Sequence, residues 1–237
     1  NFILIMNVVI TGASQGIGLA IAAAFADAGY TLLLCSKTKA NMDAAGESLI
    51  EKFHQATIYH THADLSNQQE CVKFANWCLE KGTPSILINN AGFFSPGNIQ
   101  DEADDVLEKQ LAVNLYSAYH TTRALLPAML KTGKGHVFNI CSIASLDAYA
   151  QGGSYSISKF ALLGFSKNLR LELKDKGIKV TAVCPGATYT NSWNGTGVDP
   201  NRIMESEDIA KMIFAAAHVS PQAVVEDIIM RPQKGDL

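Results

Sequence analysis

The chain has 237 residues, of which 48% are hydrophobic and 17% charged, a composition typical of core-forming globular proteins and not of disordered ones. The formal net charge is −3 and no basic run occurs, which argues against a nucleic-acid partner. Five cysteines without a C-x-x-C pair favour a reducing, cytoplasmic compartment, and no metal site is expected. The apolar segment 2–6 is too short to span a membrane and is expected to begin the first strand.

Apolar runs typical of β-strands alternate with helical stretches along the chain. We expect strands at residues 8–11, 31–35, 57–62, 86–89, 136–140, 179–184 and 228–230, and helices at 16–28, 39–53, 68–80, 106–130, 156–176 and 206–217. This alternation predicts one α/β domain over residues 1–237, a doubly wound Rossmann-type fold whose parallel seven-stranded sheet has helices on both faces. Ligands of such folds bind beyond the carboxyl ends of the strands.

A glycine-rich turn follows the first expected strand and opens the first expected helix. Its spacing, G-x-x-x-G-x-G, differs from the G-x-G-x-x-G of other dinucleotide folds. Glycines let the backbone approach a pyrophosphate, and a helix N-terminus offers free N–H groups and a positive dipole end. We therefore expect the cofactor phosphates to bind here; the alternative is a tight turn without a ligand. The residues concerned are Gly12, Ser14, Gln15, Gly16, Ile17 and Gly18.

Two residues after the second expected strand predict a preference for NADP(H). An NAD-preferring site places Asp or Glu here to bind the ribose 2′-hydroxyl, whereas this chain has Ser36 and Lys37. A small hydroxyl and a cation suit a 2′-phosphate, so NADP(H) is the expected cofactor, although lysine lacks the bidentate fork of arginine. The alternative is that Lys37 is a solvated surface lysine.

Two further strand ends are expected to complete the adenosine side of the site. Asp64 and Leu65 follow the third strand, where a carboxylate accepts from the adenine amino group or, alternatively, caps the next helix. The small residues Asn90, Ala91 and Gly92 follow the fourth strand and let the backbone pass close to the adenosine ribose, or else form a simple turn.

A tyrosine–lysine pair is the main candidate for catalysis. Tyr155 and Lys159 are spaced i, i+4 near the start of a helix, so their side chains share one face. A neighbouring ammonium lowers the pKa of a phenol from its usual value of about 10, which makes tyrosine a workable general acid for a carbonyl oxygen. Ser142, just past the fifth expected strand, can hold the substrate oxygen.

Asn114 is a poor residue for the interior of the helix expected at 106–130. We expect a local kink there, which frees a backbone carbonyl for a water that links to Lys159. The alternative is a buried amide satisfied within the core.

Together these motifs resemble the short-chain dehydrogenase/reductase family along nearly the whole chain. The T-G-x-x-x-G-I-G loop, N-N-A-G, the mid-helix Asn, the Ser, the Y-x-x-x-K pair and Pro185-Gly186 appear in the family's order. The resemblance implies that Ser142, Tyr155 and Lys159 are catalytic, with Asn114 as the fourth member, and that Lys159 also contacts the nicotinamide ribose.

The same resemblance implies that one segment holds the nicotinamide carboxamide, namely Pro185, Gly186, Thr188 and Thr190. One departure matters, because many NADP-preferring members carry Arg or Lys where this chain has Gln15. The departure weakens the NADP(H) expectation and leaves Lys37 as its support.

The C-terminal third is similar to bacterial sepiapterin reductases in segments 185–193, 207–210, 226–232 and 235–236. Residues 187–204 include two glycines and a proline and are expected to form a lid over the substrate. Aromatic residues in loops at the strand ends are expected to line the substrate pocket: Phe93, Phe94, Tyr149, Tyr189 and Trp193.

The leading functional hypothesis is an NADPH-dependent reductase of a small-molecule carbonyl, such as the dicarbonyl or pteridine substrates of sepiapterin reductase-like enzymes. A 3-oxoacyl-thioester reductase is the alternative enzyme. A dinucleotide-sensing protein of the same fold is the alternative from another class, and it should have lost Tyr155 or Lys159. Family members pair the helices at 106–130 and 156–176 with their copies, so a homodimer or homotetramer is expected.

Overall fold

The computed structural model describes residues 6–190, 193, 195 and 197–237, so residues 2–5 of the expected first strand lie outside the described part. Within that part a single sheet runs in the order β3-β2-β1-β4-β5-β6-β7, and every neighbouring pair is parallel. This is the expected doubly wound arrangement. The strands are β1 (Asn7–Thr11), β2 (Thr31–Ser36), β3 (Thr57–His62), β4 (Pro84–Asn89), β5 (Gly135–Ile140), β6 (Ile178–Pro185) and β7 (Asp227–Met230).

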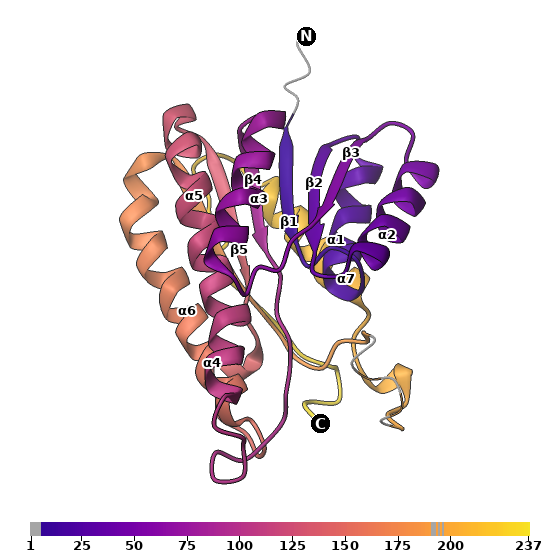
Figure 1. Cartoon of the computed structure of the whole chain (residues 1–237), viewed down its shortest axis with the longest axis vertical. Coiled ribbons are helices and arrows are strands. Elements are labelled where there is room, and N and C mark those ends of the chain that lie inside the picture. Colours follow the sequence, from indigo (N-terminus) through magenta and orange to yellow (C-terminus); the bar gives the residue numbers. More distant parts are fainter. Residues whose placement is uncertain (1–5, 191–192, 194, 196) are drawn as a thin grey trace.

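Helices cover both faces of the sheet (Figure 1). One face carries α1 (Gly16–Asp27), α2 (Lys39–Lys52) and α7 (Ser206–Ala217). The other carries α3 (Gln68–Lys81), α5 (Ser117–Thr132) and α6 (Gly153–Leu173). Shorter elements are α4 (Val106–Leu111), η1 (Ala112–Tyr116), η2 (Ile143–Ser145), η3 (Lys174–Lys176) and η5 (Pro200–Arg202).

Alternation along the strands builds the two core layers. Val8 and Ile10 of β1 pack with Phe25 of α1, whereas Val9 packs with Phe74 of α3 and Met129 of α5. Successive residues of a strand point to opposite faces, so a strand covered on both sides must be apolar throughout. Full burial of such a side chain stabilises the fold by about 1.5–3 kcal/mol.

In the described parts of the chain, no helix has the length and apolar content needed to cross a membrane.

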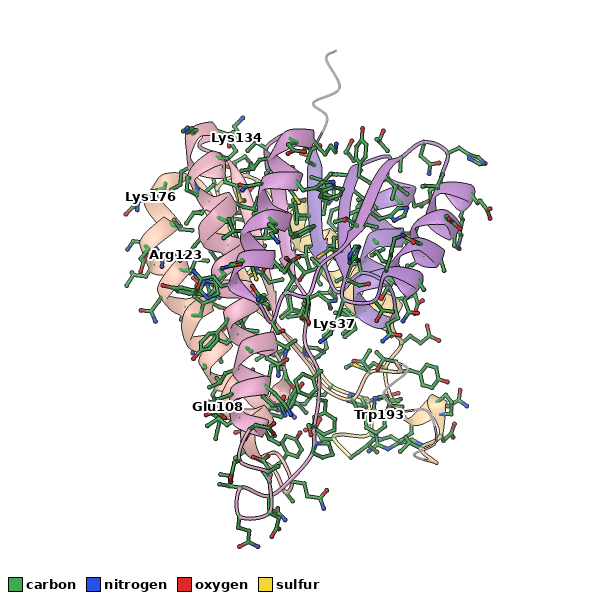
Figure 2. The ribbon with its side chains drawn as sticks, viewed as in Figure 1. Lys37, Glu108, Arg123, Lys134, Lys176 and Trp193 are labelled. Atoms are coloured by element: carbon green, nitrogen blue, oxygen red, sulfur yellow. The ribbon has the colours of Figure 1, made fainter. Side chains whose placement is uncertain are left out.

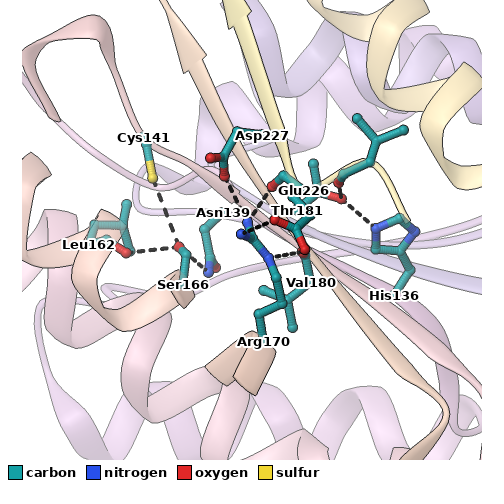
Figure 3. Close-up of polar contacts among 11 residues, drawn as sticks. His136, Asn139, Cys141, Leu162, Ser166, Arg170, Val180, Thr181, Glu226 and Asp227 are labelled. Atoms are coloured by element: carbon teal, nitrogen blue, oxygen red, sulfur yellow. Dashed lines mark hydrogen bonds and ion pairs between the residues drawn. The ribbon is translucent and has the colours of Figure 1, made fainter. Parts of the chain in front are cut away.

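A buried polar network ties β5 to its neighbours (Figure 3). The Asn139 amide donates to Ser166 of α6 at 2.8 Å, and Nε2 of His136 lies 2.7 Å from the Thr181 hydroxyl of β6. That hydroxyl donates to the Val225 carbonyl at 2.6 Å, so the Thr181 oxygen must accept from Nε2–H of a neutral imidazole. Burial lowers the pKa of His136 to about 3, which agrees with this assignment. The network fixes the strand that ends at the site.

The expected element bounds agree with the structure to within about three residues, apart from one internal interruption. The helix expected at 106–130 is broken by η1, a π-helical turn in which the Ser117 N–H bonds to the Ala112 carbonyl. The helix expected from residue 156 begins at Gly153, so Tyr155 lies in its first turn. Both differences are at the carboxyl end of the sheet.

Candidate active site

The carboxyl ends of the strands open into one cleft of about 1500 Å³. Every residue that the sequence assigned to the dinucleotide lines this cleft, as do Ser142, Phe93, Tyr149 and Trp193. Figure 2 shows Lys37 just beyond the end of the sheet, and Trp193 on the segment farther from it. Residues as far apart in sequence as Gly12 and Gly186 therefore lie in one cleft, because the carboxyl ends of parallel strands meet at one edge of the sheet.

The glycine-rich turn is held in shape by β4. A Cβ on Gly18 would overlap the Gly12 carbonyl, so only glycine allows this close approach. The Asn90 amide donates to the carbonyls of Thr11 and Gly12 at 3.0 and 2.9 Å. Thr11 Oγ1 accepts in turn from the N–H groups of Asn90 and Ala91 at 3.0 and 2.9 Å. Asn90 and Thr11 therefore shape a cradle in which the backbone is accessible to a phosphate.

At the adenosine end, Lys37 and Asp64 form an ion pair with Nζ and Oδ2 2.9 Å apart. Burial alone would raise the pKa of Asp64, but hydrogen bonds from Lys37 and Ser66 outweigh it and hold that pKa below its usual value. The lysine side chain is 73% exposed, so it can turn toward a ligand at little cost. Ser36 is buried beside it and donates to the Thr38 carbonyl at 3.4 Å.

Ser142 and Tyr155 face each other at the end of β5. Ser142 caps η2, where its Oγ accepts the Ala144 N–H at 3.1 Å, so its own proton remains to donate to another group. The pKa of Tyr155 is raised by burial, and a hydrogen bond from the Ser142 hydroxyl partly opposes that rise. Phe94 packs edge-on against the Tyr155 ring, with centroids 4.9 Å apart.

Lys159 is buried and donates from Nζ to the Ile140 carbonyl at 2.8 Å. Its Nζ lies 5.8 Å from the centre of the Tyr155 ring. Burial lowers the pKa of Lys159, and the thiols of Cys141 and Cys184 oppose that effect. The sequence predicted that this ammonium lowers the pKa of Tyr155. In the structure burial dominates and the pKa of Tyr155 is raised, so in the free protein the phenol is neutral at neutral pH.

Asn114 lies in the π-helical turn and behind the cleft wall, and is not among the described residues that line the cleft. Its Oδ1 accepts from the Phe93 N–H at 2.8 Å, and its Nδ2 donates to the Phe93 carbonyl at 3.1 Å and to Ser158 Oγ at 2.9 Å. The helix is irregular where the kink was expected, a feature common at functional sites. The side chain itself is a buried and satisfied amide, as the alternative interpretation of Asn114 expected, and the water link to Lys159 stays a prediction.

Thr190 of segment 187–204 lies against the phosphate turn, and residues 191, 192, 194 and 196 of this segment lie outside the described part. A Cβ on Gly16 would come within 2.9 Å of the Thr190 methyl group, and Thr188 Oγ1 donates to the Gly186 carbonyl at 2.9 Å. Tyr189 is not among the described residues that line the cleft; its backbone N–H bonds to the Met204 carbonyl at 2.7 Å and its side chain is 44% exposed.

Sequence reasoning missed an ionic group in the cleft wall. Arg231 pairs with Asp147 at 3.5 Å and with Asp236, and all three residues line the cleft. Their separation along the chain left no local pattern that could have predicted the contact.

Comparison with known proteins places this site in a family. A family model described as short chain dehydrogenase matches residues 6–200. A sepiapterin reductase of Chlorobaculum tepidum is 32% identical over an alignment of 237 positions, which covers 96% of each chain. An L-sorbose reductase of Gluconobacter frateurii, solved with NADPH and L-sorbose, is 26% identical with a TM-score of 0.85 and 94% of each chain covered. A metagenomic short-chain oxidoreductase solved with NADP is 28% identical with a TM-score of 0.82, covering 96% of this chain and 97% of the other.

The matched residues begin just before β1 and extend through the phosphate turn, the tyrosine helix and much of segment 187–204. The match thus includes most of the residues that line the cleft, from the phosphate turn to the tyrosine helix. The chain belongs to the short-chain dehydrogenase family of oxidoreductases.

Proposed function

We propose that the protein is an NADP(H)-dependent oxidoreductase that interconverts a carbonyl and an alcohol. The observation that carries the proposal is the convergence of Ser142, Tyr155 and Lys159 beside the phosphate cradle, in one cleft. A proton donor, a hydroxyl that holds an oxygen, and a buried cation are the groups that carbonyl reduction needs.

The residues present fit a phosphorylated dinucleotide. The Gly12–Gly18 approach leaves backbone N–H groups accessible at the start of α1, and Lys37 supplies a cation at the ribose end. The solved relatives that contain NADPH or NADP support the same cofactor for this chain. Bound NADPH would supply the hydride to the carbonyl carbon.

In the reducing direction, Ser142 and Tyr155 act on the substrate oxygen. Ser142 Oγ accepts from the Ala144 N–H, and its proton, which faces Tyr155 in the free protein, would donate to the carbonyl oxygen of a bound substrate and orient it. Tyr155 is neutral because burial raises its pKa, so it has a proton to transfer as the oxygen becomes an alkoxide. In the oxidising direction the phenol must first lose its proton.

Lys159 is proposed to stabilise the phenolate that this proton transfer leaves behind. Its Nζ is held 2.8 Å from the carbonyl of Ile140, the last residue of β5, which lies two positions before Ser142. A cation near the ring opposes the effect of burial on the charged phenolate. We also propose that Lys159, which lines the cleft, binds the nicotinamide ribose with its remaining N–H donors.

For the substrate we propose a planar or bulky dicarbonyl compound, of the kind reduced by a sepiapterin reductase. The cleft is lined by flat apolar surfaces, those of Phe93, Phe94, Tyr149 and Trp193, and the ring of Phe94 packs against Tyr155. We propose that residues 187–204 cover the substrate. We also propose that residues 1–237 form a single domain. A 3-oxoacyl thioester would use the same catalytic groups and stays the alternative substrate. A dinucleotide sensor is disfavoured because the chain retains both Tyr155 and Lys159.

The test combines a substrate panel with one variant. NADPH consumption is measured with sepiapterin, diketones, quinones and acetoacetyl thioesters, for the native protein and for Tyr155→Phe. The variant should bind NADPH normally and lose on the order of 10²-fold in kcat, because only the proton donor is removed. Full activity in Tyr155→Phe would contradict the proposal, and the order of kcat/KM across the panel separates a dicarbonyl from a thioester substrate.

We also propose a homodimer or homotetramer. Large apolar side chains are exposed on η1, α5 and α6, namely Tyr116, Tyr119, Ile157, Phe160 and Leu171. A second copy would remove these side chains from water, and closed symmetry is usual for such pairing. Light scattering at micromolar concentration should give a multiple of 25.5 kDa, and a mass of one chain would contradict the assembly.

A further inference from the structure

The helix that carries Tyr155 has no N-terminal cap of its own. Its N-cap residue is Gly152, which has no side chain to accept from the free N–H groups of the first turn. The acceptor comes from a residue far away in sequence. Glu102 Oε1 accepts the Ser154 N–H at 3.0 Å, and its Oε2 accepts the Ser154 hydroxyl. Ser154 is buried and directly precedes Tyr155.

The chain leaves room for this carboxylate. Gly153 has φ +36°, and a Cβ there would collide with Glu102 Oε1 and with the Gly97 carbonyl. Gly97 in turn donates its N–H to the Gln151 carbonyl at 3.0 Å. A side chain at residue 153 would therefore push the loop away from the helix. Glu102 is thus seated against the start of α6 by backbone contacts on both sides.

The loop that carries Glu102 is also fixed at its other end. Asn114 bonds to both the N–H and the carbonyl of Phe93, and Gln110 donates to the Ser95 carbonyl at 3.1 Å. Between these anchors, Phe94 places its ring edge-on to Tyr155 at 4.9 Å. We call residues 93–102 the strap. The strap contacts Tyr155 at its ring and holds the turn of helix from which that ring projects.

We propose that Glu102 is a positioning residue for Tyr155: by capping α6 through Ser154, it sets where the phenol meets the substrate oxygen. The proposal rests on the proposed function, in which Tyr155 is the proton donor. A carboxylate is suited to this place because the N-terminus of a helix carries partial positive charge, and charged acceptors make the stronger hydrogen bonds. Without it, the first turn of α6 would fray and the phenol would be less often in reach of the substrate.

The experiment compares Glu102→Ala with Glu102→Gln, and uses Asp104→Asn as the control. Glutamine keeps one oxygen that can accept the Ser154 N–H, whereas alanine removes both acceptors. Asp104 is an exposed acid of the same connection, so its variant removes the same charge two residues away. Five quantities are measured for each variant: kcat and KM with NADPH, the Kd of NADPH by titration, the melting temperature, and hydrogen exchange of peptides that cover residues 152–156.

Glu102→Ala should lower kcat by about tenfold or more, because small misplacements of a catalytic group are costly. The Kd of NADPH should stay unchanged, and exchange should rise at residues 152–156. Glu102→Gln should recover most of the kcat, and Asp104→Asn should match the native protein. Unchanged kcat in Glu102→Ala would overturn the proposal. So would a parallel loss of kcat, NADPH binding and melting temperature, since that pattern belongs to general destabilisation.

Tyr155→Phe separates this inference from the proposed function. If Tyr155→Phe is fully active, the proposed function fails and the inference fails with it. If Tyr155→Phe is inactive while Glu102→Ala is active, only the inference fails. In the double variant, Glu102→Ala should add little to the loss already caused by Tyr155→Phe, because a positioning residue acts through the group it positions. A further full tenfold loss in the double variant would contradict that dependence.

Discussion

Replacing Lys37 by alanine should change which nicotinamide cofactor the protein prefers. In the free structure the ammonium is paired with Asp64 at 2.9 Å, and both side chains are well exposed, at 73% and 42%. To bind a 2′-phosphate, the Lys37 ammonium must turn away from the Asp64 carboxylate or donate to the carboxylate and the phosphate at once. The effect of the variant is therefore the difference between two interactions of the same cation.

The magnitude follows from these two terms. A hydrogen bond to a charged group contributes about 1.5–3 kcal/mol. The exposed pair with Asp64 contributes about 0–1 kcal/mol, because water and salt screen it. Lys37→Ala should thus weaken NADPH by about 1–2 kcal/mol, or roughly 5- to 30-fold in Kd. NADH has no 2′-phosphate, so its Kd should hardly change.

The assay is a titration of each cofactor into the apoprotein, followed by calorimetry or nicotinamide fluorescence. Lys39→Ala is the matched control, because Lys39 is an exposed cation two residues away that pairs with Asp43 on α2. Asp64→Asn provides the opposite arm. It releases Lys37 from its partner, so the ratio of the NADH Kd to the NADPH Kd should rise, whatever Asp64 contributes to adenine binding.

Equal weakening of NADPH and NADH by Lys37→Ala would refute the reasoning, since the lysine would then have no contact with the 2′-phosphate. An identical effect of Lys39→Ala would refute it as well, because the effect would be one of net charge. Raising the ionic strength should lower the native protein's selectivity for NADPH over NADH, because salt screens an exposed contact more than a buried one.

Three further predictions concern pH and the substrate. His136 has a folded pKa of about 3, below its unfolded value of about 6.5, so stability is fully present above pH 6.5 and is lost as the pH falls toward 3. Urea titrations should show a slope of up to about 1.4 kcal/mol per pH unit in that window, which His136→Gln should flatten; equal slopes would contradict the assignment. Because burial raises the pKa of Tyr155, carbonyl reduction should persist through neutral pH and fall only in the alkaline range, while alcohol oxidation rises there; a reduction profile that falls through neutral pH would count against it. Trp193→Ala should raise KM for planar substrates by roughly 2- to 12-fold, the equivalent of about 0.5–1.5 kcal/mol of stacking, and leave KM for small ketones unchanged. An equal rise in KM for both would mean that Trp193 only anchors its segment.

Much of the fold could be predicted from the sequence because its signals are local. The strand at residues 57–62 and the helix at 206–217 have the predicted bounds, since apolar periodicity and turn residues act over a few positions. The parallel topology then brought the strand ends together. That is why residues as distant as Gly12 and Ser142 could be assigned to one cleft before any contact was known.

Other features were decided by the tertiary structure alone. The sequence contains Glu102 and Ser154, but nothing in their surroundings indicates that the carboxylate caps a helix through a residue 52 positions later in the chain. The same holds for the pairing of Lys37 with Asp64, each of which was assigned to a separate part of the cofactor. Such contacts depend on which side chains the packing of loops and helices leaves facing one another.

The pKa of Tyr155 shows the physical reason most directly. From spacing alone, the lysine one turn away predicted a lowered pKa, because i, i+4 neighbours on a helix lie close together. The structure buries the phenol, and this desolvation raises its pKa by more than the hydrogen bond from Ser142 lowers it, while Lys159 donates to the Ile140 carbonyl. The sequence by itself determined which groups share the helix face; burial, which is a property of the whole fold, decided the direction in which the pKa of Tyr155 moves.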